Sequence, residues 1–191
     1  MERRGEPVMS GFIKEPVRGP VVIDKLGLRI DKQADESVHG GENKAIYGFP
    51  GEHLPELREW LQARNGTSNN KFGEPLEAGS LGANFRLKGL LEDEVFEGDR
   101  FEIVSPGHVR RGATLVARSP REPCFKASEL FPGIADWMIN AAKPGIYFGV
   151  QLDRALKKSG ATIYPGDRLV PVERRSITEI FYEKMGKNRK L

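Results

Sequence analysis

Glycine and proline interrupt this sequence so often that long regular elements have little room. The 191 residues include 22 glycines and 13 prolines, while aromatic residues make up only 8%. Both residue types mark turns, because glycine tolerates positive φ and proline fixes φ and lacks an amide hydrogen. The chain is therefore expected to form many short strands joined by turns, with few long helices.

Short β-rich runs recur between these turn residues, at a spacing typical of an all-β barrel or sandwich. The runs span residues 20–24, 37–49, 100–104, 114–117, 145–152 and 168–173. Two of them begin at the arginine of a Gly-Asp-Arg sequence, which occurs at 98–100 and again at 166–168. Each copy predicts a turn or bulge leading into the strand, since glycine accepts positive φ and aspartate bonds its own backbone.

Three segments have the apolar spacing of helices. Residues 52–64 place three leucines and Trp60 on one stripe, which assigns Trp60 to the core, and Gly66 follows as a typical helix end. Residues 134–142 show a similar stripe that a Pro-Gly pair terminates. A third helix is expected over 176–185, where a serine and a glutamate three residues later resemble a capping box.

The length of the chain fits one domain with short appendages. We expect an N-terminal tail at 1–10, a β-rich domain at 11–173, and a C-terminal helix with a basic tail at 174–191. The polar, glycine-rich segment 66–82 is expected to be a mobile loop, and loops over a rigid core often shape a site.

Charge and cysteine content narrow the classes of function. Thirty basic against 27 acidic residues leave a net charge of +3, so nucleic-acid binding is permitted but not indicated, and no aromatic residues interleave with the basic ones as a stacking platform requires. No apolar run is long enough to span a membrane. A single cysteine excludes an intramolecular disulfide and a zinc site of several thiolates, which favours a reducing, cytoplasmic location.

That single cysteine, Cys124, is the natural centre of any chemistry. It lies in the stretch 119–126, between two prolines, two basic side chains and an aromatic residue. Cationic neighbours favour the thiolate, which is both a nucleophile and a ligand for soft metals. The alternative is a buried thiol that acts only as a small apolar side chain.

Three motifs in order give the chain a family resemblance. Residues 31–41 read Asp-Lys-Gln-Ala-Asp-Glu-Ser-Val-His-Gly-Gly, residues 81–85 read Leu-Gly-Ala-Asn-Phe, and residues 119–126 read Ser-Pro-Arg-Glu-Pro-Cys-Phe-Lys. Together they resemble the MOSC domain, the molybdenum-cofactor sulfurase C-terminal domain, in its small stand-alone bacterial-type branch. The resemblance covers roughly residues 11–171.

The resemblance implies a mainly β fold, a distorted β-barrel with a few peripheral helices that holds the molybdenum cofactor. Cys124 is then the metal ligand. The positions that match the family's cofactor-binding residues are Lys14, Arg18, Lys32, His39, Gly40, Gly41, Asn43, Lys44 and Asn84. Pyridoxal phosphate is a further ligand that the family resemblance admits.

Each of these positions has a structural alternative. His39-Gly40-Gly41 also fits a bulged strand, the basic residues also fit an ordinary surface, and Asn84 also fits a turn. Three positions depart from the family pattern, namely Ile30, Ala83 and Glu122. Glu122 adds a carboxylate two residues from the proposed ligand, which would disfavour anionic ligands. The chain also carries at most one helix of the branch's three-helix C-terminal extension.

Relatives in this branch reduce N-hydroxylated compounds such as hydroxylamino bases, amidoximes and hydroxamic acids, so the resemblance implies that activity here. Cys124 and His39 are the candidate catalytic residues, with His39 or a water as proton donor. The chain has neither iron–sulfur cysteines nor a nucleotide fingerprint, so a separate electron-donor reductase is implied, and a homodimer is an open expectation.

Two other activities remain open from the sequence. Cys124 could carry a persulfide sulfur or the molybdenum cofactor to another protein. A thiol hydrolase would need a histidine and an acid around Cys124, and three histidines give that reading thin support.

Overall fold

The computed structural model describes residues 13–31, 40–123 and 125–176. Two sheets account for the strands of this part of the chain. The smaller sheet has the order β2 (Gly27–Leu28), β1 (Val21–Asp24), β8 (Ala161–Ile163). The larger sheet has the order β4 (Phe85–Leu87), β3 (Ile46–Pro50), β7 (Ile146–Leu152), β6 (Arg110–Pro120), β5 (Arg100–Val104), β9 (Arg168–Glu173).

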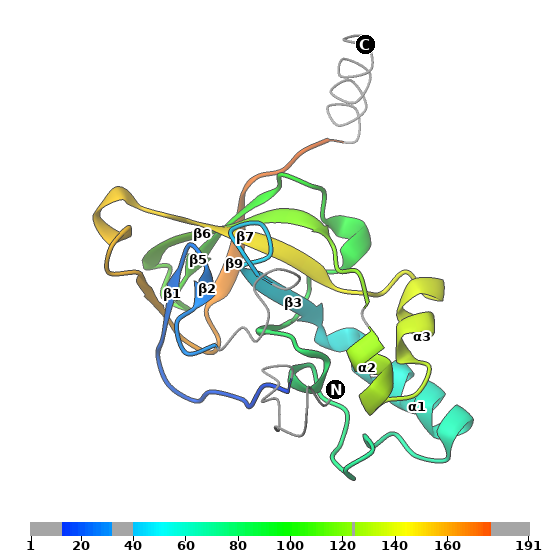
Figure 1. The fold of residues 1–191 in the computed structure, drawn as a ribbon. Helices are drawn as coiled ribbons and strands as arrows, with labels where there is room; N and C mark the ends of the chain where they lie inside the picture. Colours follow the sequence, from blue (N-terminus) through cyan, green and yellow to red (C-terminus); the bar gives the residue numbers. More distant parts are fainter. Residues whose placement is uncertain (1–12, 32–39, 124, 177–191) are drawn as a thin grey trace.

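The larger sheet curls strongly, and the small sheet lies beside its concave side (Figure 1). All its pairings are antiparallel except that of β3 with β4. Between the sheets lies an apolar core that includes Ile23, Phe101, Leu115 and Phe148. The predicted mainly β architecture is confirmed, with the barrel realised as a curled half-barrel sheet.

A second apolar core lies on the other face of β3 and β7, under the helices. The helices that contribute to it are α1 (Leu54–Asn65), η2 (Gly79–Leu81), α2 (Phe125–Leu130) and α3 (Ile134–Asn140). The other short helices are η1 (Gly51–His53), η3 (Glu92–Glu94) and η4 (Arg154–Leu156), and Leu156 of η4 packs against the core between the sheets. The core joins Tyr47 and Tyr147 of the strands to leucines of α1 and to Ile134 and Met138 of α3. The sheet is therefore apolar on both faces at its centre.

The first two predicted helices are confirmed. Leu54, Leu57 and Leu61 are buried, and α1 ends at Gly66, whose φ of 72° closes the helix in the left-handed conformation. Trp60, expected in the core, is only partly buried at the edge of the helix-side core. The helix predicted over 176–185 lies outside the described residues apart from its first residue, and α2 was not predicted.

The strands at 100–104 and 168–173 are confirmed to the residue, and those at 20–24 and 145–152 begin one residue later than predicted. The run 114–117 is the middle of the longer β6. The strand predicted over 37–49 is wrong in its described first part, because residues 40–45 form turns and bends and β3 starts at Ile46.

Both Gly-Asp-Arg turns are confirmed. Gly98 and Gly166 have φ of 92° and 90°. The Asp99 carboxylate accepts a hydrogen bond from the amide of Phe96 at 3.1 Å, and the Asp167 carboxylate accepts one from Tyr164 at 2.8 Å. The same three residues thus close the same turn at two places on the sheet.

The segment 66–82, expected to be a mobile loop, is instead anchored in the core. Leu76 and Leu81 are fully buried, and the segment ends in the short helix η2. Its polar composition hid these two anchors. Among the residues that the structure describes, no helix is both long enough and apolar enough to cross a bilayer.

Candidate functional site

The centre of the candidate site is a pair of tyrosines on the helix-side face of the large sheet. Tyr47 of β3 lies directly opposite Tyr147 of β7 in the antiparallel register, and their ring centroids are 5.7 Å apart. Their neighbours Ile46 and Phe148 point into the core between the sheets. Each strand therefore gives one face to the inner core and the other to this aromatic pair.

Two cations lie over these two rings. The Arg121 guanidinium is 4.7 Å from the Tyr47 centroid, and the Lys44 ammonium is 5.4 Å from the Tyr147 centroid. Arg121 is only 4% exposed, and its amide donates to the carbonyl of Gly145 at 2.9 Å. Since Arg121 follows the end of β6, the strand delivers the chain to this face three residues before Cys124.

A third cation, Arg118, lies against the same face at Gly149 of β7. A Cβ atom at position 149 would be 2.9 Å from Arg118 Nε and 3.2 Å from its Nη2, and 2.8 Å from the carbonyl oxygen of Glu42. The Nε atom is buried and has no hydrogen-bond partner among the described residues. In the described part of the chain, neither Arg118 nor Lys44 forms an ion pair.

A short polar relay links the N-terminal segment to the tyrosine pair. Lys14 Nζ forms an ion pair with the carboxylate of Asp31, whose other oxygen accepts a 2.6 Å hydrogen bond from Asn84 Nδ2. Asn84 in turn accepts from the amide of Tyr47 at 2.9 Å and donates its own amide to the Tyr47 carbonyl at 2.8 Å. Asn84 is therefore fixed in place by backbone on one side and by Asp31 on the other.

Burial raises the pKa of the Tyr47 phenol above its ordinary value, against the opposing effect of Arg121. The neutral hydroxyl donates to the carbonyl of Pro144 at 2.9 Å. Tyr47 thus acts as a hydrogen-bond donor and an aromatic support, and its proton is held at any physiological pH.

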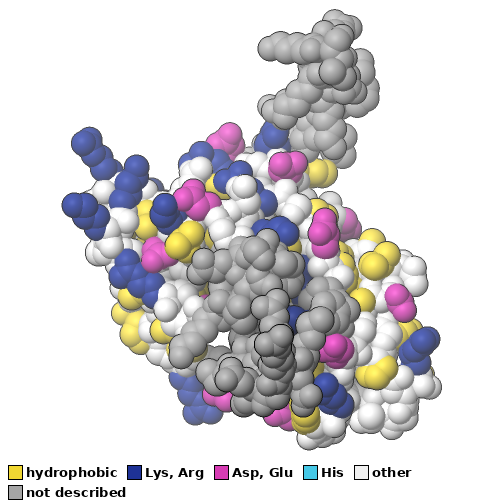
Figure 2. Space-filling model, in the orientation of Figure 1, with side chains coloured by type: hydrophobic (Ala, Val, Ile, Leu, Met, Phe, Trp, Pro, Cys, Tyr) yellow, Lys and Arg dark blue, Asp and Glu magenta, His cyan; other side chains and the backbone are white. Residues whose placement is uncertain are grey.

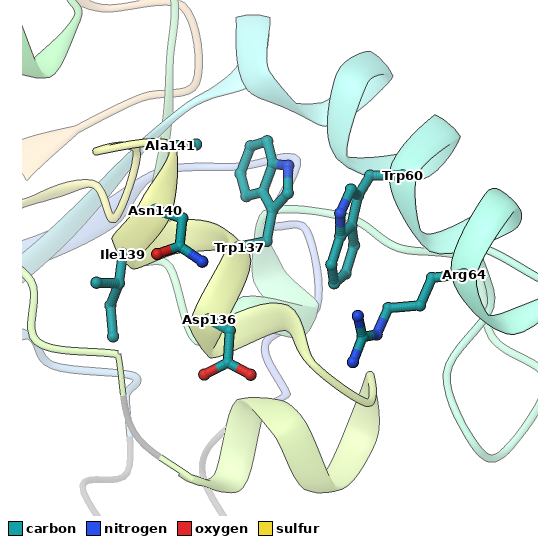
Figure 3. A pocket seen from close by; sticks show the side chains of 7 residues that line it. All are labelled: Trp60, Arg64, Asp136, Trp137, Ile139, Asn140 and Ala141. Atoms are coloured by element: carbon teal, nitrogen blue, oxygen red, sulfur yellow. The ribbon is translucent and has the colours of Figure 1, made fainter.

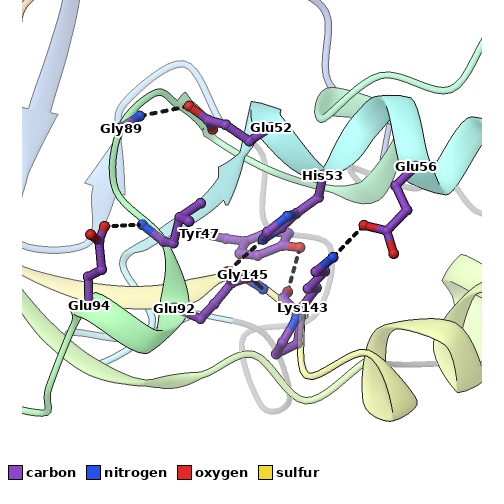
Figure 4. A network of polar contacts seen from close by, with 11 residues as sticks. Tyr47, Glu52, His53, Glu56, Gly89, Glu92, Glu94, Lys143 and Gly145 are labelled. Atoms are coloured by element: carbon purple, nitrogen blue, oxygen red, sulfur yellow. Dashed lines mark hydrogen bonds and ion pairs between the residues drawn. The ribbon is translucent and has the colours of Figure 1, made fainter.

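A second polar cluster lies on the other side of the Pro144-Gly145 turn (Figure 4). His53 Nε2 lies 2.7 Å from one carboxylate oxygen of Glu92, and the Gly145 amide donates to the other oxygen at 2.7 Å. Burial raises the pKa of Glu92, but the hydrogen bonds from His53 and Gly145 outweigh it and leave the pKa below its ordinary value. Both oxygens are occupied, so this cluster joins η1 to the turn before β7.

A surface cavity lies elsewhere, between α1 and α3. It has a volume of about 600 Å³ and is lined by Trp60, Arg64, Asp136, Trp137, Ile139, Asn140 and Ala141 (Figure 3). None of these residues belongs to the three motifs. The described residues also contain no group of three or more histidine, cysteine, aspartate or glutamate side chains placed to hold a metal ion.

Comparison with known proteins decides the family. The family model of the MOSC domain matches residues 35–170. The chain belongs to the MOSC domain family. It is 34% identical over 150 residues to protein YiiM of Escherichia coli K12, which covers 76% of this chain and 58% of that protein. It is 28% identical over 166 residues to the uncharacterized protein YflK of Bacillus subtilis 168, covering 85% and 66%.

Solved MOSC relatives share the fold. The crystal structure of YiiM from Geobacillus stearothermophilus is similar with a TM-score of 0.61 and 29% identity, over 94% of this chain and 75% of that one. YiiM from Escherichia coli gives 0.60 and 25%, over 84% and 65%. The chain spans 58% to 66% of the length of the two relatives compared by sequence.

Within the described residues, only some of the predicted cofactor-binding positions lie near the tyrosine pair. Lys14, Lys44 and Asn84 lie around the tyrosine pair, as described above. Gly40 and Gly41 have φ of 128° and 79°, and the Lys44 amide donates to the Gly41 carbonyl at 3.1 Å, so the glycine pair makes the turn that presents Lys44.

Other predicted positions are not placed at this site. Arg18 and Asn43 are exposed, with no hydrogen bond or ion pair among the described residues. Cys124, Lys32 and His39 lie outside the described residues, so their predicted roles stay predictions. The sequence did not single out Arg118, Arg121 or the tyrosines as site residues.

The three residues that depart from the MOSC pattern differ in burial. Ala83 is 5% exposed and packs in the helix-side core, where a glutamate side chain would have to bury its charge. Ile30 is 58% exposed. Glu122 is also exposed, so water screens its charge from the buried face beneath Arg121.

Proposed function

We propose that this MOSC protein binds the molybdenum cofactor and reduces N-hydroxylated compounds with electrons from a separate reductase. The observation that carries the proposal is the cation-covered tyrosine pair at the end of β6, three residues before Cys124. Its cations suit an anionic ligand, and along the chain Arg121 comes three residues before Cys124, the only thiol in the sequence.

The residues present fit such a cofactor, which carries a phosphate and holds a high-valent metal through sulfur ligands. Arg121 and Lys44 each present charge over an aromatic ring. Arg118 has a buried donor with no partner among the described residues, and its guanidinium lies close against Gly149 of β7. A buried charged donor with no acceptor is costly, so the folded chain favours an anion here.

In the proposed reaction, different side chains hold the metal, fix the binding segment and supply protons. Cys124 holds the metal through its thiolate, which cationic neighbours favour. Lys14, Asp31 and Asn84 hold the segment before Lys32 against the backbone of Tyr47. His39 or a water supplies protons, because an imidazole titrates near working pH. When bound, the cofactor supplies the two-electron reduction that removes oxygen from the substrate nitrogen.

The first experiment compares protein from two hosts, one able and one unable to make the pterin. We expect molybdenum, measured by elemental analysis, in a ratio near one per chain only from the competent host, and its loss in Cys124→Ser. Protein from the competent host that lacks the pterin, or that keeps it equally well without Cys124, would refute the proposal.

The second experiment separates catalysis from carriage. With an artificial electron donor, loaded protein should convert a hydroxylamino purine to the aminopurine, and Cys124→Ser should not. Loaded protein without turnover would assign it to cofactor transfer instead. Sulfur released by mild reductant from metal-free protein would assign Cys124 to persulfide transfer. We place this chemistry in the cytoplasm, where a lone thiol stays reduced.

A further inference from the structure

We propose that Arg118 and Lys44 bind a phosphate monoester over Gly149, on the helix-side face of β7. This inference rests on the proposed function and adds to it the residues that recognise the phosphate. Lys44 is among the cofactor-binding positions that the family resemblance matched, whereas Arg118 and Gly149 are not, so the new element is the role of Arg118 at Gly149.

The donor geometry of Arg118 is the first support. Nε and Nη2 both border the point that a Cβ at position 149 would occupy, at 2.9 Å and 3.2 Å. These two nitrogens form one edge of the guanidinium, the edge that recognises phosphate or carboxylate through two parallel hydrogen bonds. Since Nε is buried and has no partner among the described residues, it is a donor that an incoming acceptor would satisfy.

The glycine is the second support. Gly149 lies within β7 in an extended conformation that any residue adopts, so conformational freedom does not explain it. A side chain there would collide with Arg118 and with the Glu42 carbonyl. Glycine inside a strand commonly marks close approach by another group, and here the missing side chain lets the Arg118 guanidinium lie directly against β7.

The charge balance is the third support and indicates a dianion. Gly149 and Tyr147 are two residues apart on β7, so they project to the same face, and Lys44 lies over Tyr147. The nearest acid in sequence, Glu42, is paired with Lys25 instead. Glu92 is held by His53 and Gly145. Two cations without a carboxylate partner in the described chain match the charge of a phosphate monoester.

The direct test is titration of inorganic phosphate into cofactor-free protein by calorimetry. We expect saturable binding that weakens at least tenfold in Arg118→Met and less in Arg118→Lys, which keeps the charge but loses the paired donors. Arg110→Met is the matched control, because Arg110 lies on the same strand but is exposed and paired with Glu102. The phosphate affinity of Arg110→Met should differ less than twofold from that of the wild type. Thermal melting checks that each variant is folded.

Two further arms identify the source of the phosphate. If it belongs to the cofactor, Arg118→Met from the competent host holds several-fold less pterin. If it belongs to the substrate, pterin content is unchanged and the KM for a hydroxylaminopurine nucleotide rises while that for the free base does not.

The outcomes separate this inference from the proposed function. Equal phosphate affinity in wild type and folded Arg118→Met, or no phosphate binding by wild type, overturns the role of Arg118, whatever the protein's cofactor content. Phosphate binding that depends on Arg118 in a protein that never acquires pterin sustains the anion site and refutes the cofactor proposal.

Discussion

Two charged clusters lie near the tyrosine pair, and they differ in how completely they are satisfied. The Glu92 carboxylate has both oxygens bonded, to His53 and to the Gly145 amide. Arg118 has a buried nitrogen with no acceptor. A satisfied buried charge stabilises the fold, whereas an unsatisfied one opposes it and persists where a ligand completes it. The comparison assigns structure to the first cluster and binding to the second.

The largest expected effect is the loss of the satisfied acid. Glu92→Ala leaves buried His53 and the Gly145 amide without their acceptor, so we expect the free energy of unfolding to fall by about 3 kcal/mol. Urea denaturation measures it. Lys143→Ala is the control, since its ion pair with Glu56 is more exposed and should contribute under about 1 kcal/mol. Equal losses in both variants would contradict the distinction.

The next largest effect is expected at Gly149. Gly149→Ala places a Cβ against Arg118 and the Glu42 carbonyl, and such overpacking destabilises by about 1–3 kcal/mol. Phosphate affinity should fall with it, because the methyl group would displace the Arg118 guanidinium from its position against β7. Gly107→Ala provides a comparison at a glycine with open surroundings, where no atom lies closer than 3.9 Å. Unaltered stability and binding in Gly149→Ala would mean that the space has no role.

A smaller effect on stability is expected when the unsatisfied charge is removed. Arg118→Met keeps much of the apolar stem and removes a buried donor without an acceptor, so the free energy of unfolding should stay within about 0.5 kcal/mol of wild type or rise. The same denaturation series measures it on cofactor-free protein. A loss as large as that of Glu92→Ala would show that Arg118 is part of the fold.

The smallest effect is expected from protonation of Glu92, which changes the stability of the fold only at acidic pH. Its pKa in the folded chain lies below the ordinary 4.5, so the folded state binds fewer protons than the unfolded state in this range. The stabilisation is therefore complete above about pH 4.5 and is lost as the pH falls through the folded pKa. Stability measured from pH 6 to pH 3 should decline more steeply in wild type than in Glu92→Gln, and parallel curves would remove Glu92 as a cause.

Much of the fold followed from the sequence because its signals are local. The leucine stripe before Gly66 and the two Gly-Asp-Arg turns each determine their own structure within a few residues. The strands β2, β4 and β8 have only two or three residues, which is too short for an alternating pattern to show. In segment 66–82 the buried leucines depend on contacts with distant helices, which composition does not reveal.

The site was less predictable for a related reason. Lys14, Lys44 and Asn84 were found through the family resemblance, whereas the roles of Arg118 and Arg121 become visible only when β6 and β7 are placed in register. An arginine in a strand is ordinary in a sequence. The one local signal was Gly149, a glycine inside an otherwise β-branched and aromatic run, which indicates close approach but does not say of what.

The turn at Asp99 also determines how the molecule would respond to force. Asp99 is fully buried, and its carboxylate accepts from the Arg175 amide and pairs with Arg174 Nε at 3.3 Å, directly after edge strand β9. A pulling force applied to the chain beyond residue 176 would act on these Asp99 contacts before it reached the hydrogen bonds between β9 and β5. Once these contacts opened, β9 could separate from β5 one residue pair at a time, so Asp99, together with the bonds from Arg174 and Arg175 to the Glu94 and Glu97 carbonyls, protects that edge of the sheet.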